Sequence, residues 1–157
     1  MNEICVNIVT RSELKGHHNL VNLLQACRKE RRSLKFDKYS FFEPIKKPLS
    51  EEAVSEIASS DNFCILLRDS KRAITGSIWM NNSIRLVSFE SKKWTDQLSS
   101  DLWELTRDIS QVIDIDFAFM DTLTQRVIQR GKEKGAVIKT NKNNNVYMYS
   151  LFSKSLS

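Results

Sequence analysis

The sequence predicts an α+β fold, in which helices pack chiefly on one face of a mostly antiparallel sheet. Three short apolar runs, Phe63–Leu67, Ala73–Met80 and Ile84–Phe89, are separated by turn formers and are typical of an antiparallel meander. At 157 residues and 41% hydrophobic content, the chain fits a single domain spanning residues 1–157. The strongest helical signal, between Trp94 and Ile113, is a stripe with spacings of three and four: Leu98, Leu102, Leu105, Ile109 and Val112.

The N-terminal third is predicted to contain one strand and two helices. Residues Glu3–Thr10 alternate apolar and polar side chains, which indicates a strand. Asn19 can cap a helix, and Ser50, followed by Glu51 and Glu52, can cap a shorter one that ends by Ser60. The first of these helices has an apolar stripe made of Leu20, Leu23, Leu24 and Cys27.

The C-terminal third continues the alternation of elements. Ile115–Met120 reads as a well-buried strand, and Asp121-Thr122 is predicted to begin a helix that stops at Gly135. Two last strands are expected over Ala136–Thr140 and Val146–Phe152.

The register of the hairpin between the second and third apolar runs decides which side chains share a face. A two-residue loop would mix apolar and polar residues on both faces, whereas a three-residue loop pairs Met80 with Ile84 and Ile78 with Leu86. We therefore predict the three-residue loop. The opposite face would then carry Thr75, Ser77, Trp79, Arg85, Val87 and Phe89, with Trp79 across from Arg85.

Charge is unevenly distributed along the chain, whose net charge is +5. Residues 27–47 contain eight basic and three acidic residues, so this segment is basic. Residues 94–121 contain seven acidic residues and one basic residue, whereas residues 122–157 contain seven basic residues and one acidic residue. Such segregation can steer a partner, or it can join two faces of one fold.

Other general features favour a cytoplasmic protein with no membrane partner. No apolar run approaches about eighteen residues, and the N-terminus lacks a basic region followed by a long apolar one. Cys5, Cys27 and Cys64 lie in apolar patterns without paired spacing and are expected to be buried reduced thiols.

Catalytic signatures are few, so the sequence favours a protein that is not an enzyme and needs no metal or cofactor. Asp114-Ile115-Asp116 could hold a divalent cation, as in a metal-dependent nucleotidyl enzyme. Such enzymes pair the carboxylates with a Gly-Ser turn, but Gly76-Ser77 falls in a predicted strand, 38 residues upstream. No nucleophile elbow, dinucleotide loop or phosphate loop is present.

A nucleic-acid-binding module is the first alternative, ahead of the nucleotidyl enzyme, and it depends on the segment 28–47. There, Phe36, Tyr39, Phe41 and Phe42 are interleaved with lysines, a composition used to stack bases and follow phosphates. The same composition suits a loop that anchors its aromatic side chains in the core.

One stretch resembles a known class of protein. Trp103-Glu104-Leu105-Thr106 through Asp116-Phe117-Ala118-Phe119 is an acid-faced helix that runs into a buried strand. This layout is similar to that of the small α+β immunity proteins which bacteria pair with secreted toxins. The resemblance implies a single-domain cytoplasmic inhibitor that blocks one toxin by contact. The basic net charge departs from the acidic charge usual for inhibitors of nuclease toxins.

Protein binding is therefore the leading functional hypothesis. Binding surfaces concentrate their energy in aromatic and arginine anchors. The candidate anchors lie on the second sheet face and along the acidic helix, provided that no further helix covers that face: Trp79, Arg85, Trp94, Asp101, Trp103, Glu104 and Asp108.

Overall fold

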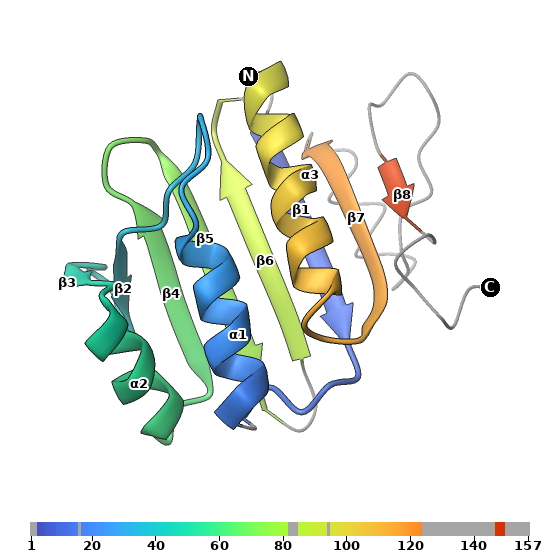
Figure 1. The fold of residues 1–157 in the computed structure, drawn as a ribbon. Coiled ribbons are helices and arrows are strands. Elements are labelled where there is room, and N and C mark those ends of the chain that lie inside the picture. Colours follow the sequence, from blue (N-terminus) through green and yellow to red (C-terminus); the bar gives the residue numbers. More distant parts are fainter. Residues whose placement is uncertain (1–2, 16, 82–84, 94, 124–146, 150–157) are drawn as a thin grey trace.

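The computed structural model describes residues 3–15, 17–81, 85–93, 95–123 and 147–149 (Figure 1). Its strands are β1 (Glu3–Thr10), β2 (Lys38–Ser40), β3 (Lys47–Pro48), β4 (Cys64–Asp69), β5 (Ile74–Met80), β6 (Arg85–Ser91), β7 (Ile115–Leu123) and β8 (Tyr147–Tyr149). They form one sheet in the order β3-β2-β4-β5-β6-β1-β7-β8, in which every neighbouring pair is antiparallel. The predicted α+β class and the meander β4-β5-β6 are confirmed.

Three helices lie on the same side of this sheet: α1 (His17–Arg28), α2 (Glu51–Ser59) and α3 (Asp96–Ser110) (Figure 1). The Ser50 hydroxyl caps α2 by accepting a hydrogen bond from Ala53 N, as predicted. The predicted cap of α1 is wrong, because the helix begins two residues before Asn19, whose amide nitrogen donates to the carbonyl of Glu13 at 2.9 Å.

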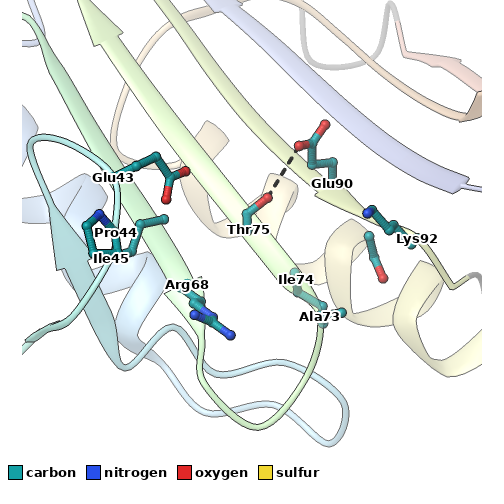
Figure 2. Close-up of a pocket in the computed structure, with 10 residues that line it drawn as sticks. Glu43, Pro44, Ile45, Arg68, Ala73, Ile74, Thr75, Glu90 and Lys92 are labelled. Carbon is teal, nitrogen blue, oxygen red and sulfur yellow. Dashed lines mark hydrogen bonds between the residues drawn. The ribbon is translucent and has the colours of Figure 1, made fainter.

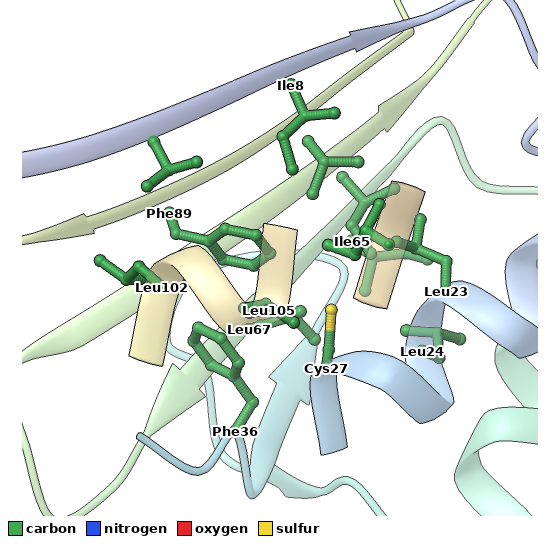
Figure 3. Close-up of a cluster of buried hydrophobic side chains, with 14 of the residues drawn as sticks. Ile8, Leu23, Leu24, Cys27, Phe36, Ile65, Leu67, Phe89, Leu102 and Leu105 are labelled. Atoms are coloured by element: carbon green, nitrogen blue, oxygen red, sulfur yellow. The ribbon is translucent and has the colours of Figure 1, made fainter. Parts of the chain in front are cut away.

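The core fills the space between the helices and the sheet (Figure 3). The predicted stripe of α1 is buried, and Leu102 and Leu105 of α3 reach the same cluster. Phe36, from the segment before β2, stacks on Phe89 of β6 with ring centroids 5.3 Å apart. Buried strand positions that face the helices form what we call the covered face: Ile4, Val6 and Ile8 of β1, Ile65 and Leu67 of β4, Ile74, Gly76 and Ile78 of β5, and Val87 and Phe89 of β6.

The β5–β6 hairpin differs from the predicted register by one residue. Met80 pairs with Arg85 and Ile78 with Val87, so four residues connect the strands instead of three. Because side chains alternate along a strand, this shift turns Val87 and Phe89 toward the helices. The predicted register placed Leu86 in the core and Val87 and Phe89 on the opposite face. Because Leu86 is no more apolar than Val87 and Phe89, the sequence pattern does not distinguish the two registers, and only packing against the helices selects one.

Strand β7 is longer than expected. It continues to Leu123 along β1, with Ile4 opposite Thr122 and Glu3 opposite Leu123. The prediction of a helix beginning at Asp121-Thr122 is therefore wrong at its start, because pairing with β1 overrides the local capping signal. The remainder of that predicted helix and the strand at Ala136–Thr140 lie outside the described residues, whereas β8 falls within the predicted last strand.

Candidate protein-binding face

The sheet face turned away from α1, α2 and α3 carries no described helix, and we call it the open face (Figure 1). It consists of the strand positions that alternate with the covered ones. Trp79 in the middle strand β5 is 40% exposed, and its pairing partners Cys64 and Leu86 are only partly buried. Trp79 Nε1 donates to Ser77 Oγ at 3.2 Å, which orients the ring along its own strand. The open face therefore presents an indole at its centre strand.

Polar and charged residues occupy the other end of the same strands. Here Thr75 of β5 pairs with Arg68 of β4 on one side and with Glu90 of β6 on the other. Thr75 Oγ1 donates to Glu90 Oε1 at 3.4 Å. Trp79 lies four residues further along β5, about 13 Å away at the rise of a strand. The face is thus divided into an aromatic end and a charged end.

A cleft of about 360 Å³ opens at the charged end, between the loop 41–46 and strands β4 to β6. Figure 2 shows Glu43 from the loop on one side and Lys92, just after β6, on the other. Arg68 and Glu90 lie between them. All four side chains are exposed, and none of them forms an ion pair with another described residue. The cleft therefore holds two positive and two negative groups that form no ion pair with other described residues, although Glu90 accepts the hydrogen bond from Thr75.

Sequence reasoning missed these cleft residues for a physical reason. Arg68 and Glu90 come from strands that are both adjacent to β5, and only the register of two hairpins places them beside Thr75. Glu43 reaches the cleft because the loop between β2 and β3 folds over the sheet, burying Ile45.

Arg85, predicted to stack on Trp79, does not lie opposite it. Trp79 pairs with Leu86, and Arg85 pairs with Met80. The Arg85 guanidinium donates to the carbonyl of Arg11 at 2.8 Å and lies 3.4 Å from Glu13 Oε2. The predicted Trp79–Arg85 pair is therefore wrong, and its cause is the hairpin shift. Trp94, another predicted anchor, lies outside the described residues.

The predicted acidic surface of α3 is partly used inside the fold. Asp101 was expected to face outward, but it is 4% exposed, and this expectation is wrong. Its carboxylate accepts hydrogen bonds from Ser33 N at 2.6 Å and Ser33 Oγ at 2.5 Å, and from Gln97 at 2.9 Å. Asp101 thus fixes the turn after α1 against α3. Trp103, on the same helix, is partly buried and packs against the core.

The other acids of α3 face basic residues of the same chain. Asp108 Oδ2 lies 2.6 Å from Arg31 Nη2, and the Arg31 side chain is 1% exposed. Lys29 Nζ lies 3.3 Å from Glu104 Oε1 and 3.6 Å from Asp108 Oδ2. These contacts explain much of the charge segregation along the sequence, because the basic turn after α1 is neutralised by the acidic face of α3. Of the predicted acids, Glu104 alone is exposed.

The aromatic residues proposed to stack nucleic-acid bases are mostly in the core. Phe36 and Tyr39 are buried, and burial raises the pKa of the Tyr39 hydroxyl. Phe41 is partly buried against the core, while Phe42 is 75% exposed on the loop 41–46. The stacking surface predicted over 28–47 is therefore wrong for Phe36 and Tyr39, whose rings anchor this segment between the helices and the sheet.

The arrangement required for a nucleotidyl enzyme is not formed either. Gly76 and Ser77 lie within β5, and strands β6 and β1 separate β5 from β7, a distance of about 14 Å. Asp116 Oδ1 lies 2.5 Å from Arg11 Nε, and Asp114 precedes the strand, where its backbone amide donates to Ser12 Oγ. Among the described residues, no group of three or more His, Cys, Asp or Glu side chains could hold a metal ion.

The three cysteines, all of which lie within the described residues, form no disulfide bonds with one another. Cys5 and Cys27 are buried as expected, whereas Cys64 is only half-buried on the open face. Complete burial raises the pKa of Cys27 to about 12, and burial also raises the pKa of Cys64. A high pKa keeps both thiols protonated and poorly nucleophilic at neutral pH.

The comparisons with known proteins leave the class open. No protein-family model matches the chain, and no curated protein sequence matches it. Of the helices in the described part of the chain, none has the length and apolar character needed to cross a membrane.

Proposed function

We propose that the protein is a non-catalytic inhibitor that neutralises a cognate toxin domain by direct contact, and that the open face is its contact surface. The observation that carries the proposal is Trp79, a large aromatic side chain left exposed on a face without a described helix. Tryptophan is enriched among the few residues that dominate the binding energy of protein interfaces.

The unpaired charges of the cleft support the same choice of face. Charged groups at the rim of an interface steer the encounter and set the orientation of the partner. Arg68 and Glu90 are positioned for this role beside the aromatic end, whereas Asp101 and Asp108 are already committed to contacts with Ser33 and Arg31. The proposed contact surface therefore keeps Trp79 from the sequence-based set and replaces the acidic helix by the cleft.

The direct test asks whether a reading frame beside the gene of this protein encodes a secreted-toxin domain, and then titrates that domain with the protein. Isothermal titration should give a one-to-one complex, and Trp79→Ala should weaken it by about thirtyfold or more, the loss expected for a central anchor. The matched control is Phe63→Ala, because Phe63 is also exposed, but its ring lies under Lys15 Nζ near α1, at 3.9 Å. Phe63→Ala should leave the affinity unchanged.

A stoichiometry measurement separates contact inhibition from catalysis. Toxin activity should fall in proportion to added inhibitor and vanish at one equivalent. Complete protection by a small fraction of an equivalent would contradict the non-catalytic mechanism. Equal affinities for the parent and Trp79→Ala, at equal melting temperatures, would instead reject the open face as the contact surface.

A further inference from the structure

At one end of β5, the open face carries opposite charges on the two strands that flank it. Either side of Thr75 lie Arg68 on β4 and Glu90 on β6. Trp79, at the other end of β5, is flanked by the uncharged residues Cys64 on β4 and Leu86 on β6. The sign of charge thus reverses across β5 at one end of the strand, while both sides are apolar at the other.

Such a pattern is self-complementary about one particular axis. If two copies meet by their open faces around a two-fold axis that runs along β5, the β4 side of one copy lies over the β6 side of the other. Arg68 of each copy then faces Glu90 of the second copy, and the two Trp79 side chains meet near the axis. Packed sheets keep their strands within about 30° of each other, an angle that a two-fold axis along β5 permits.

The alternative two-fold axis, in the same plane but across the strands, is unfavourable. It would place the charged row at Thr75 over the aromatic row at Trp79, so that Arg68 and Glu90 would lose water without gaining a partner. Burying an unpaired charge costs several kcal/mol. Charge complementarity therefore selects a single arrangement of the two copies.

The loop 41–46 also takes part in this arrangement. Glu43 and Lys92 border the cleft on opposite sides of β5 (Figure 2). Rotation about β5 places the loop of one copy, which carries Glu43, against the β6 side of the other. Arg68 and Glu90 find opposite charges in this way, and the two loops flank the contact.

We propose that a second copy of this chain covers the open face in the free protein, as a two-fold dimer centred on β5. This inference goes beyond the toxin inhibitor proposed above and does not require it. Five strands of about six residues give a flat footprint of about 450 Å² per copy, to which side-chain relief and the loops add area. That size lies at the low end for specific interfaces, so we expect a weak dimer that dissociates on dilution.

The test is sedimentation velocity of the full-length protein over a range of concentrations. Arg68→Glu and Glu90→Arg each replace two attractive contacts per dimer by two repulsive ones and should raise the dissociation constant at least about tenfold. The double variant Arg68→Glu with Glu90→Arg exchanges the signs and should restore the dimer. The control is Glu52→Arg, which makes the same change of charge as Glu90→Arg but on the exposed surface of α2. This variant should dimerise like the parent.

Melting temperatures of all variants show whether they remain folded, and Arg68→Gln serves as a milder variant if a reversal lowers them. A protein that stays monomeric at its solubility limit overturns the proposal. So does a dimer that withstands both single reversals, because its interface then lies elsewhere. Failure of the double variant to regain dimerisation contradicts the pairing of Arg68 with Glu90, and with it the axis along β5.

Discussion

Gly76 offers a sharp test of the packing, because its missing side chain makes room for Phe89. A Cβ atom added at Gly76 would lie 2.9 Å from Phe89 Cδ1 and 3.2 Å from Phe89 Cε1. The Phe89 ring is fully buried and stacked on Phe36, so it cannot move aside freely. Overpacking of this kind costs about 1–3 kcal/mol, and the smaller chain entropy of unfolded alanine returns about 0.4–1 kcal/mol. We therefore expect Gly76→Ala to destabilise the fold by about 1–2 kcal/mol.

The loss is measurable by thermal or urea unfolding followed by circular dichroism. For a chain of this size, it corresponds to a fall in Tm of about 2–8 °C. Phe89→Leu should cost less in the Gly76→Ala background than in the parent, with a coupling energy of about 1 kcal/mol. Ser88→Ala, which changes an open-face neighbour, is the control and should stay within about 0.5 kcal/mol.

The same variant distinguishes the two hairpin registers. With a three-residue loop, Phe89 would lie on the open face, away from Gly76, and Gly76→Ala would be neutral or stabilising. A Gly76→Ala protein as stable as the parent, or more stable, would therefore refute the register and the packing described above. Because Gly76 belongs to the covered face, the substitution does not change the side chains of the open face.

Two further predictions concern contacts that hold the chain between α1 and β4. Asp101→Ala leaves the amide and hydroxyl of Ser33 without their buried acceptor and should destabilise the protein by about 1–3 kcal/mol, measured by urea unfolding. An unchanged midpoint would show that Asp101 does not hold this turn. Burial acts to raise the pKa of Asp37, but hydrogen bonds from the hydroxyl and amide of Ser70 outweigh it and hold that pKa below its ordinary value of 3.8. The stability that this carboxylate contributes is present above its unfolded pKa and is lost as the pH falls through the lower folded pKa. Melting curves should therefore show Asp37→Asn less stable than the parent at neutral pH, with the difference narrowing as the pH falls below 3.8; a constant difference would contradict the assignment.

Much of the secondary structure followed from local patterns. The stripe from Leu98 to Ile109 predicted α3, because burying one face of a helix requires apolar residues at spacings of three and four. The cap at Ser50 located α2, since a hydroxyl there satisfies an amide that the helix leaves free. The candidate site was predicted only in part: Trp79 was identified as an exposed aromatic residue, while its neighbours were not.

What the sequence alone determined is therefore the α+β class, the meander and the helices whose apolar stripes are unambiguous, because these depend on neighbours within a few residues. Only the tertiary structure decided the hairpin register, the fate of the acids on α3 and the composition of the cleft. A shift of one residue in a hairpin leaves the local pattern almost as apolar, so packing of Phe89 against Phe36 makes the choice. Asp101 meets Ser33 across 68 residues of sequence, and Arg68 meets Thr75 through strand pairing, contacts that no local pattern contains.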